Sequence, residues 1–354
     1  MSDLSSVGHH FVVGLAGTTL TDLDKKILED LRPVGVLFLK RNFIHEASYQ
    51  EWLSKFATLL DQIKAYTGRD KMFFSIDHEG GRVHRTPAPL THFPYAAYYQ
   101  DKCFEVAKAM AIELKSIGIN LSWSPCVDIN SNPNNPVIGE RSFGNTAEIV
   151  SQKTALFFRG LVENGMLACI KHFPGHGDTV KDSHFDLPSV DLSLEQLINR
   201  ELKPFSDLIN QGCPMVMTSH IIFPQIDPNN PATLSKIILK DILRKKLGFQ
   251  GVIVTDDLDM HAISKNFSEQ IVVQNALLAG CELFIVARHP DGTSDKLLVM
   301  ANYLKNEISS NVEAKKASDE AKSKIEYLIS HATGHYKPRE LTKEQFEEHC
   351  NILM

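Results

Sequence analysis

The 354-residue sequence lacks the features that mark membrane proteins and nucleic-acid-binding proteins. It has no run of the 18 or more apolar residues that a membrane-spanning helix requires. Its first residues contain neither the basic region nor the long apolar region of a signal peptide. Positive charge is not in excess, since the formal net charge is -6 at pH 7. We therefore expect no membrane partner and no nucleic-acid partner.

Cysteine is scarce, and no two cysteines form the C-x-x-C pair that is common in zinc and redox sites. Several cysteines lie within apolar runs, as Cys169 does in LACIKHF (167–173). This pattern predicts reduced, mostly buried thiols and a protein of the cytoplasm. Glycine-rich phosphate loops are missing as well, because neither G-x-G-x-x-G nor G-x-x-x-x-G-K-[S/T] occurs.

What the chain does have is an alternation of short apolar runs with helix-length amphipathic segments. The runs are typical of strands buried on both faces, and they lie at residues 11–15, 34–39, 72–77, 121–129, 166–173, 215–221, 251–257 and 283–287. Eight strands, each followed by a helical stretch, predict a single (β/α)8 barrel, with a doubly wound open sheet as the alternative. We assign residues 1–333 to the barrel and residues 334–354 to a polar C-terminal tail, packed on the barrel or partly free.

Helix limits are predicted at three places. Residues 46–66 have the periodicity of an amphipathic helix. Ser193 and Gln196 have the spacing of a capping box, and Pro204 is expected to end or kink the helix that they begin. Ser235 is expected to cap a further helix.

Polar side chains gather where the apolar runs end. They are Asp77, Asp128, Lys171 with His172, Ser219 with His220, Asp256 with Asp257, and Arg288 with His289. The carboxyl ends of the strands form the active-site face of a (β/α)8 barrel. Strands can also become polar simply because they emerge into solvent, but ionisable groups at six of the eight ends favour a site.

The strand VIVTDDLDM (252–260) delivers Asp256 directly after an apolar run. A carboxylate held this rigidly suits a nucleophile or a group that stabilises a developing cation. The alternative is a helix N-cap, a position that aspartate often occupies. Asp257 or Asp259 could equally supply that cap.

The loop KHFPGHGDTVKDSHFDLP (171–188) is the richest in ionisable and flexible residues. Asp182 and His184 are two residues apart, so in an extended segment they face the same side. A carboxylate beside a histidine can orient the ring for proton transfer near neutral pH. Two alternatives stay open. His176 and Asp178 could join this pair as ligands of a divalent metal ion, or they could hydrogen-bond within the loop, which we favour for these two.

Lys171 and His172 open the same loop, and Lys171 can hold a hydroxyl or amide oxygen of a substrate. His172 could instead be a histidine whose hydrogen bonds are satisfied in the core. Two further turns place charge beside glycine: SIDHEGGRVHR (75–85) and GERSFG (139–144). In the first turn Asp77 could accept hydrogen bonds from hydroxyls, and Arg82 or Arg85 could clamp a polar ligand. In the second turn Arg141 could do the same. The alternative is that each charged turn is simply solvated.

Three of these stretches together resemble the family 3 glycoside hydrolases, and within them the cytoplasmic β-N-acetylhexosaminidases of peptidoglycan recycling. They are IDHEGGRVHR (76–85), KHFPGHGDTVKDSH (171–184) and ILRKKLGFQGVIVTDDLDM (242–260), and the similarity extends from about residue 10 to 330. One departure is His78, where members commonly have glutamine.

The resemblance implies a (β/α)8 barrel and a role for each motif residue. Asp256 would be the catalytic nucleophile, and Asp182 with His184 would be the acid/base dyad. The terminal N-acetylglucosamine would be bound by Asp77, Arg85, Arg141, Lys171 and His172. It implies retaining exo-hydrolysis of a β-linked N-acetylglucosamine from peptidoglycan fragments, with no metal or organic cofactor, by a monomer whose partner is this small glycan.

Other functions stay open at this point. A metal-dependent hydrolase would use the His/Asp loop as ligands. A β-glucosidase or a glycoside phosphorylase of the same family would share the barrel and its nucleophile. A non-catalytic sugar-binding barrel would keep the pocket without turnover.

Overall fold

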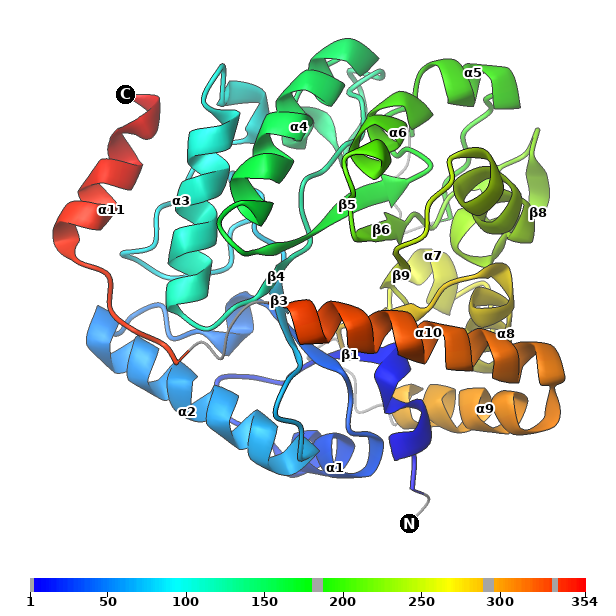
Figure 1. The fold of residues 1–354 in the computed structure, drawn as a ribbon, viewed down its shortest axis with the longest axis horizontal. Coiled ribbons are helices and arrows are strands. Elements are labelled where there is room, and N and C mark those ends of the chain that lie inside the picture. Colours follow the sequence, from blue (N-terminus) through cyan, green and yellow to red (C-terminus); the bar gives the residue numbers. More distant parts are fainter. Residues whose placement is uncertain (1–2, 180–186, 289–295, 333–336) are drawn as a thin grey trace.

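Eight parallel strands close into a barrel in the computed structural model, which describes residues 3–179, 187–288, 296–332 and 337–354 (Figure 1). The strands follow one another around the barrel in the order β1-β10-β9-β6-β5-β4-β3-β2. Their bounds are β1 (Phe11–Gly14), β2 (Gly35–Phe38), β3 (Phe73–Ile76), β4 (Leu121–Ser122), β5 (Leu167–Phe173), β6 (Met215–Thr218), β9 (Val252–Asp257) and β10 (Leu283–Val286). Since β1 pairs with both β2 and β10, the sheet has no free edge, and the open-sheet alternative is wrong.

All eight predicted runs contribute a strand, but the run 121–129 is much less regular than expected. Its regular pairing ends at Ser122, and beyond that point an isolated bridge between Cys126 and Lys171 and single backbone hydrogen bonds keep it beside β5. Pro125 lies between these two points and has no N–H to donate to a neighbouring strand. The remainder of this run is therefore an irregular extension of β4, and it carries Asp128 beyond the end of the regular strand.

Helices surround the barrel (Figure 1). In the described residues they are α1 (Asp22–Leu31), α2 (Tyr49–Thr67), α3 (Cys103–Ser116), α4 (Ala147–Val162), α5 (Leu194–Asn199), α6 (Leu202–Asn210), the π-helical η6 (Ile237–Lys246), α7 (His261–Ser264), α8 (Glu269–Ala279), α9 (Lys296–Ser310), α10 (Val312–His331) and α11 (Lys343–Cys350). A two-stranded antiparallel excursion, β7 (Ile222–Phe223) with β8 (Asp227–Pro231), follows β6. None of these helices is both long and apolar enough to cross a membrane.

The predicted helices are present, but their limits differ in places: α2 begins at Tyr49 rather than at residue 46, and the N-cap of η6 is Lys236 rather than Ser235. Ser193 and Gln196 form the expected capping box, and the Ser235 hydroxyl accepts the N–H of Ile238 at 3.2 Å. The helix that Ser193 begins already ends at Asn199, and Pro204 lies in the first turn of the next helix. Pro204 is tolerated there because the first N–H groups of a helix have no partner within it.

Side chains on the strands alternate between two packed layers. Val12 points into the barrel with Phe73, Trp123 and Met217, whereas Phe11 and other alternate residues pack outward against the helices. Full burial of each such side chain contributes roughly 1.5–3 kcal/mol. The strands are thereby held rigidly, which fixes where their carboxyl ends lie.

Helix α10 closes the opposite, amino-terminal end of the barrel. Its residues Ala321, Ile325 and Ile329 pack into the interior layer. Its Ser318 hydroxyl lies 2.7 Å from Nε2 of His10, the residue that precedes β1. Among the described residues, α10 therefore covers this end of the barrel.

The C-terminal helix α11 lies beside α3 (Figure 1). Phe346 is buried and meets the ring of Tyr49 edge-on, with 5.6 Å between centroids. Nδ1 of His349 lies 2.7 Å from a carboxylate oxygen of Glu113. The division of the chain at residue 333 stays a prediction, because residues 333–336 lie outside the described ranges.

Candidate active site

The carboxyl ends of the strands surround a cavity of about 270 Å³. It is lined by Asp77, Arg82, Val83, Arg85, Val137, Arg141, Lys171, His172, His176 and Asp256. Six of the residues singled out from the sequence as nucleophile or sugar ligands are among them. The two remaining predicted residues, Asp182 and His184, lie outside the described residues. Three motifs that are far apart in the chain therefore share one cavity.

Asp256 enters this cavity from the end of β9. The strand is hydrogen-bonded on both sides, to β6 and to β10, and a carboxylate oxygen of Asp256 accepts the N–H of Asp257 at 2.8 Å. The cap alternative is not supported, since the N-cap of the short helix α7 is Met260 and no side chain caps it. A carboxylate is thus held at a rigid strand end and lines the cavity.

Asp257 has different surroundings from its neighbour. Its carboxylate accepts the N–H groups of Ala287 at 2.9 Å and of Asp259 at 3.1 Å. Burial, and next the charge of Asp259, raise the pKa of Asp257 to about 7. This side chain does not line the cavity. The two consecutive aspartates therefore differ in role: Asp256 lines the cavity, whereas Asp257 connects β9 to β10.

A network of buried ions underlies the cationic wall of the cavity. The Glu79 carboxylate accepts hydrogen bonds from Nε and Nη2 of Arg141, at 2.8 and 2.9 Å, and lies 2.6 Å from Nζ of Lys171. Lys171 also donates to Asp77 at 2.7 Å. Each of the two cations is thereby placed by carboxylates from another segment of the chain.

The network keeps its members charged. Burial by itself would raise the pKa of Glu79, but Arg141 and Lys171 outweigh it and hold that pKa well below its usual range. Burial likewise opposes the charged form of Lys171, yet Asp77 and Glu79 raise its pKa above the ordinary value. Near neutral pH the cavity therefore presents fixed cations to the oxygens of a ligand.

Glu79 was not identified from the sequence. The available signal was its place in SIDHEGGRVHR, one residue beyond His78 and two beyond Asp77, with two glycines after it. A charged turn of this kind is usually solvated, and only the fold shows that Glu79 is 5% exposed. Its partners come from β5 and from the loop 139–144, so no local pattern reveals them.

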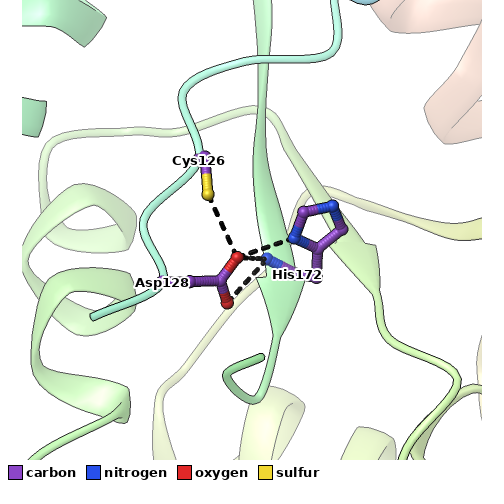
Figure 2. Close-up of side chains that lie close together, drawn as sticks. All are labelled: Cys126, Asp128 and His172. Carbon is purple, nitrogen blue, oxygen red and sulfur yellow. Dashed lines mark hydrogen bonds and ion pairs between the residues drawn. The ribbon is translucent and has the colours of Figure 1, made fainter. Parts of the chain in front are cut away.

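His172 is held from behind by Asp128, as Figure 2 shows. Its Nδ1 lies 2.6 Å from Oδ2 of Asp128, and its ring lines the cavity. The alternative that His172 is a core histidine with its hydrogen bonds satisfied is therefore correct for Nδ1, which is bonded in the interior, although the residue also lines the cavity. Burial opposes ionisation of Asp128, but the charge and hydrogen bond of His172 outweigh it and lower the pKa of Asp128 to about 2.

Cys126 completes a cluster whose ligand atoms could converge on a metal ion. Its Sγ, Oδ2 of Asp128 and Nδ1 of His172 all lie within 4.8 Å of one another. The thiol donates to Oδ2 of Asp128 at 3.1 Å. Burial, and next the charge of Asp128, raise the pKa of Cys126 well above its ordinary value, so the thiol keeps its proton. These contacts describe a hydrogen-bonded cluster rather than a thiolate ligand set.

The segment after β5 is anchored by backbone contacts. The side-chain amide of Asn135 donates to the carbonyls of His176 at 2.8 Å and of Gly177 at 3.0 Å. At Gly177 any Cβ would lie 1.6 Å from the carbonyl oxygen of Ile129, so only glycine fits. The chain therefore passes very close to the segment after β4.

The metal alternative involves four residues of the loop, of which His176 and Asp178 lie in the described part of the chain. Both of them bond to protein groups. Nδ1 of His176 lies 2.9 Å from the hydroxyl of Thr179, a bond within the loop as expected. Asp178 instead forms an ion pair with Arg200 at 2.8 Å, outside the loop. Neither Asp178 nor Thr179 lines the cavity.

The two candidate arginine clamps both line the cavity but differ in their bonding. Arg82 donates to the carbonyls of Val137 and Pro136. Nε of Arg85 is buried and has no hydrogen-bond partner among the described residues. Arg85 therefore lines the cavity while its buried Nε stays without a partner in the described part of the chain.

Other strand-end residues are used structurally. His220 bonds through its ring nitrogens to the hydroxyl of Thr233 at 2.7 Å and to the carbonyl of Asp257 at 3.0 Å. Arg288 pairs with the buried Asp24 of α1 at 2.5 Å. Neither residue lines the cavity, and His289 lies outside the described residues.

Comparison with known proteins agrees with this arrangement. The family model described as the glycosyl hydrolase family 3 N-terminal domain matches residues 13–328. A β-hexosaminidase of Neisseria meningitidis serogroup C (strain 053442) is 35% identical over 289 residues, which are 78% of this chain and 77% of that protein.

Solved structures agree in fold over almost the whole chain. A family 3 β-N-acetylglucosaminidase from Paenibacillus sp. str. FPU-7 has a TM-score of 0.88 and 32% identity, covering 99% of this chain and 68% of that one. NagZ from Neisseria gonorrhoeae, in complex with N-trifluoroacetyl-D-glucosamine, has a TM-score of 0.74 and 28% identity, covering 98% of both chains. With the family model matching most of its length, the chain belongs to glycosyl hydrolase family 3.

Proposed function

We propose that this protein is an exo-acting, retaining β-N-acetylglucosaminidase that removes terminal N-acetylglucosamine. The observation that carries the proposal is the cavity of about 270 Å³ in which Asp256 faces the cations held by Glu79. Ligand pockets commonly measure about 300–1,000 Å³, so this one suits a single sugar. The β-hexosaminidase and the sugar-bound NagZ described above support the choice of N-acetylglucosamine.

The charge of the cavity wall suits an uncharged ligand rich in oxygen atoms. Lys171, Arg141 and Arg85 place cations on the cavity wall, and Asp77 is a carboxylate that can accept from hydroxyl groups. We assign these four residues and His172 to binding of the terminal sugar. Donors and acceptors fixed before the ligand arrives lose little freedom on binding.

The reaction would proceed in two displacements at the anomeric carbon. In the first, a carboxylate oxygen of Asp256 bonds to that carbon while the glycosidic bond breaks, and His184 gives a proton to the departing oxygen. In the second, His184 takes a proton from water, whose oxygen bonds to the anomeric carbon as the bond to Asp256 breaks. Asp182 would orient the ring of His184.

The natural substrates we propose are peptidoglycan fragments in which N-acetylglucosamine is linked to anhydro-N-acetylmuramic acid, with or without peptide. We place this activity in the cytoplasm and assign it to a monomer. The free thiols support a reducing compartment, since every cysteine is unpaired and only Cys350 is exposed. Mass spectrometry of digested muropeptides and light scattering of the purified protein test the substrate and the monomer.

A substrate panel tests the central proposal. The protein should release nitrophenol from a nitrophenyl N-acetyl-β-glucosaminide far faster than from the β-glucoside. The rate should be unchanged by added phosphate, and proton NMR should show the β-anomer as the first product. Preference for the glucoside, acceleration by phosphate or an α-anomeric product would each replace the proposal with a different activity, and no turnover would favour a binding protein.

A further inference from the structure

Asp128 accepts hydrogen bonds from three different residues. Oδ1 accepts the backbone N–H of His176 at 2.7 Å, and both oxygens lie 3.2–3.3 Å from the backbone nitrogen of His172. Oδ2 accepts from the thiol of Cys126 at 3.1 Å and lies 2.6 Å from Nδ1 of His172. Asp128 is 1% exposed and does not line the cavity, so it acts only through the residues that it holds.

The carboxylate determines which nitrogen of His172 carries the proton. An ionised carboxylate can only accept, so Nδ1 must be the donor in their bond. In a neutral ring Nε2 is then left as an acceptor, and in Figure 2 this second nitrogen lies on the side of the ring away from Asp128. Because His172 lines the cavity, this nitrogen would face the sugar.

The same carboxylate fixes the chain on both sides of the histidine ring. It holds the backbone of His172 at the end of β5 and that of His176, which also lines the cavity. Cys126 adds a donor from the other segment, and its position two residues before Asp128 places both side chains on the same side of an extended chain. The ring of His172 is therefore constrained in position as well as in protonation.

We propose that Asp128 is a positioning residue that keeps a proton on Nδ1 of His172, so that in the neutral ring Nε2 is the nitrogen left as a hydrogen-bond acceptor for the bound sugar. The sugar contact rests on the proposed function, whereas the placement of the proton does not. The two claims can fail separately, because the protonation of the ring is measurable without any substrate.

The variant Asp128→Asn tests this directly. The amide has nearly the same shape, but one of its two polar atoms is an NH₂ donor. Facing Nδ1, that donor favours the opposite tautomer, with the proton on Nε2. Long-range ¹H–¹⁵N NMR distinguishes the two tautomers, and the signal of His172 is assigned by its loss in His172→Gln. In a pH titration, at the pH values where the ring of His172 is neutral, we expect Nδ1–H in the unmodified protein and Nε2–H in Asp128→Asn.

Kinetics give a second measure of the same change. Loss of a group that orients a metal-ligating histidine commonly costs about 10- to 100-fold in metal affinity or activity, and we use the same factor for a histidine that binds a sugar. We expect kcat/KM for the N-acetylglucosaminide to fall by about that factor, with the greater part in KM because the lost contact is to the bound sugar. The inhibition constant of free N-acetylglucosamine should rise in parallel.

Asp227→Asn is the matched control. Asp227 is also a buried carboxylate, which accepts the N–H groups of Asn229 and Asn230 at 3.2 Å and the hydroxyl of Ser235 at 2.7 Å. The variant Asp227→Asn should lower the melting temperature of the protein but leave the tautomer of His172 and the KM unchanged. Cys126→Val, which removes one weak donor, should also leave the tautomer unchanged.

Several results would overturn the proposal. One such result is a proton on Nε2 in the unmodified protein, and this measurement does not depend on the folding of any variant. Asp128→Asn could fold and keep Nδ1–H, or Asp227→Asn could raise KM equally. Stoichiometric binding of zinc alone that is lost in Cys126→Val would make the cluster a metal centre instead. If the unmodified protein cleaves no glycoside, the proposed function fails, while the NMR result still decides the role of Asp128.

Discussion

Glu79→Gln would remove the shared counter-ion of Arg141 and Lys171 while keeping the shape of the side chain. The carboxylate makes three short contacts, at 2.6, 2.8 and 2.9 Å, and all three side chains are buried. Glutamine keeps one acceptor oxygen but turns an NH₂ group toward a cation. Breaking a buried ion pair by removing one partner commonly costs about 3–5 kcal/mol, because the other charge is left uncompensated.

That free energy corresponds to a measurable thermal shift. The entropy of unfolding is about 2.1 cal/mol/K per residue, which over 354 residues gives a shift of roughly 1.3 °C for each kcal/mol. We therefore expect calorimetry at pH 7 to find Glu79→Gln about 4–7 °C less stable. KM should rise, since both released cations line the cavity.

The pH dependence makes the test specific to the charge of Glu79. Its pKa is lower in the folded protein than in the unfolded chain, so its stabilising effect is fully present above the unfolded pKa. The effect is lost as the pH falls through the folded pKa. The gap in melting temperature between the two proteins should thus be constant from pH 6 to 8 and should shrink in more acidic solution.

Glu163→Gln is the control for this experiment. Glu163 pairs with Arg159 at 3.0 Å on the surface of α4, and both side chains are about half exposed. A pair of this kind contributes about 0.3–0.5 kcal/mol, so its loss should hardly change the melting temperature. A shift below about 1 °C for Glu79→Gln, or a gap that does not depend on pH, would refute the argument that Glu79 holds two buried cations.

Three further predictions concern the chemistry. Asp256→Ala should stay folded and lose nearly all turnover, whereas Asp257→Ala should lose less; near-normal rates in Asp256→Ala would remove the nucleophile assignment. Activity should survive exhaustive chelation, and loss to EDTA with recovery on one added metal would establish the metal alternative. His184→Ala should slow cleavage of a natural disaccharide far more than glycosylation by a nitrophenyl glycoside, whose leaving group needs no proton. Mass spectrometry should then detect a glycosyl-enzyme on Asp256, and Asp182→Ala should show a milder effect; equal slowing for both substrates without a trapped intermediate would show that His184 is not the acid/base.

The sequence alone was sufficient to predict the barrel and the location of the cavity. Strands buried on both faces are continuous apolar runs, and this signal is local in the chain. Closure of parallel strands then brings their carboxyl ends together, so Asp77, Lys171 and Asp256 could be expected at one site from their places after apolar runs. Their convergence in one cavity agrees with that expectation.

Local patterns were less informative where the backbone could satisfy them in more than one way. The run 121–129 was expected to be a strand throughout, but its regular pairing ends before Pro125. Pro204 was expected to end a helix, and it lies instead in the first turn of the next one. In both places the limits of the strand or helix depend on how the segment around the proline packs, which a local pattern does not show.

Only the tertiary structure decided the roles of Glu79 and Asp128. Each is an acidic residue near a turn or strand end, where exposure to solvent is the ordinary expectation. Each is instead nearly fully buried and bonded to partners distant in the chain: Arg141 and Lys171 for Glu79, and His172 for Asp128. A buried carboxylate is stabilised only by such partners, and bringing those partners together requires the closed barrel.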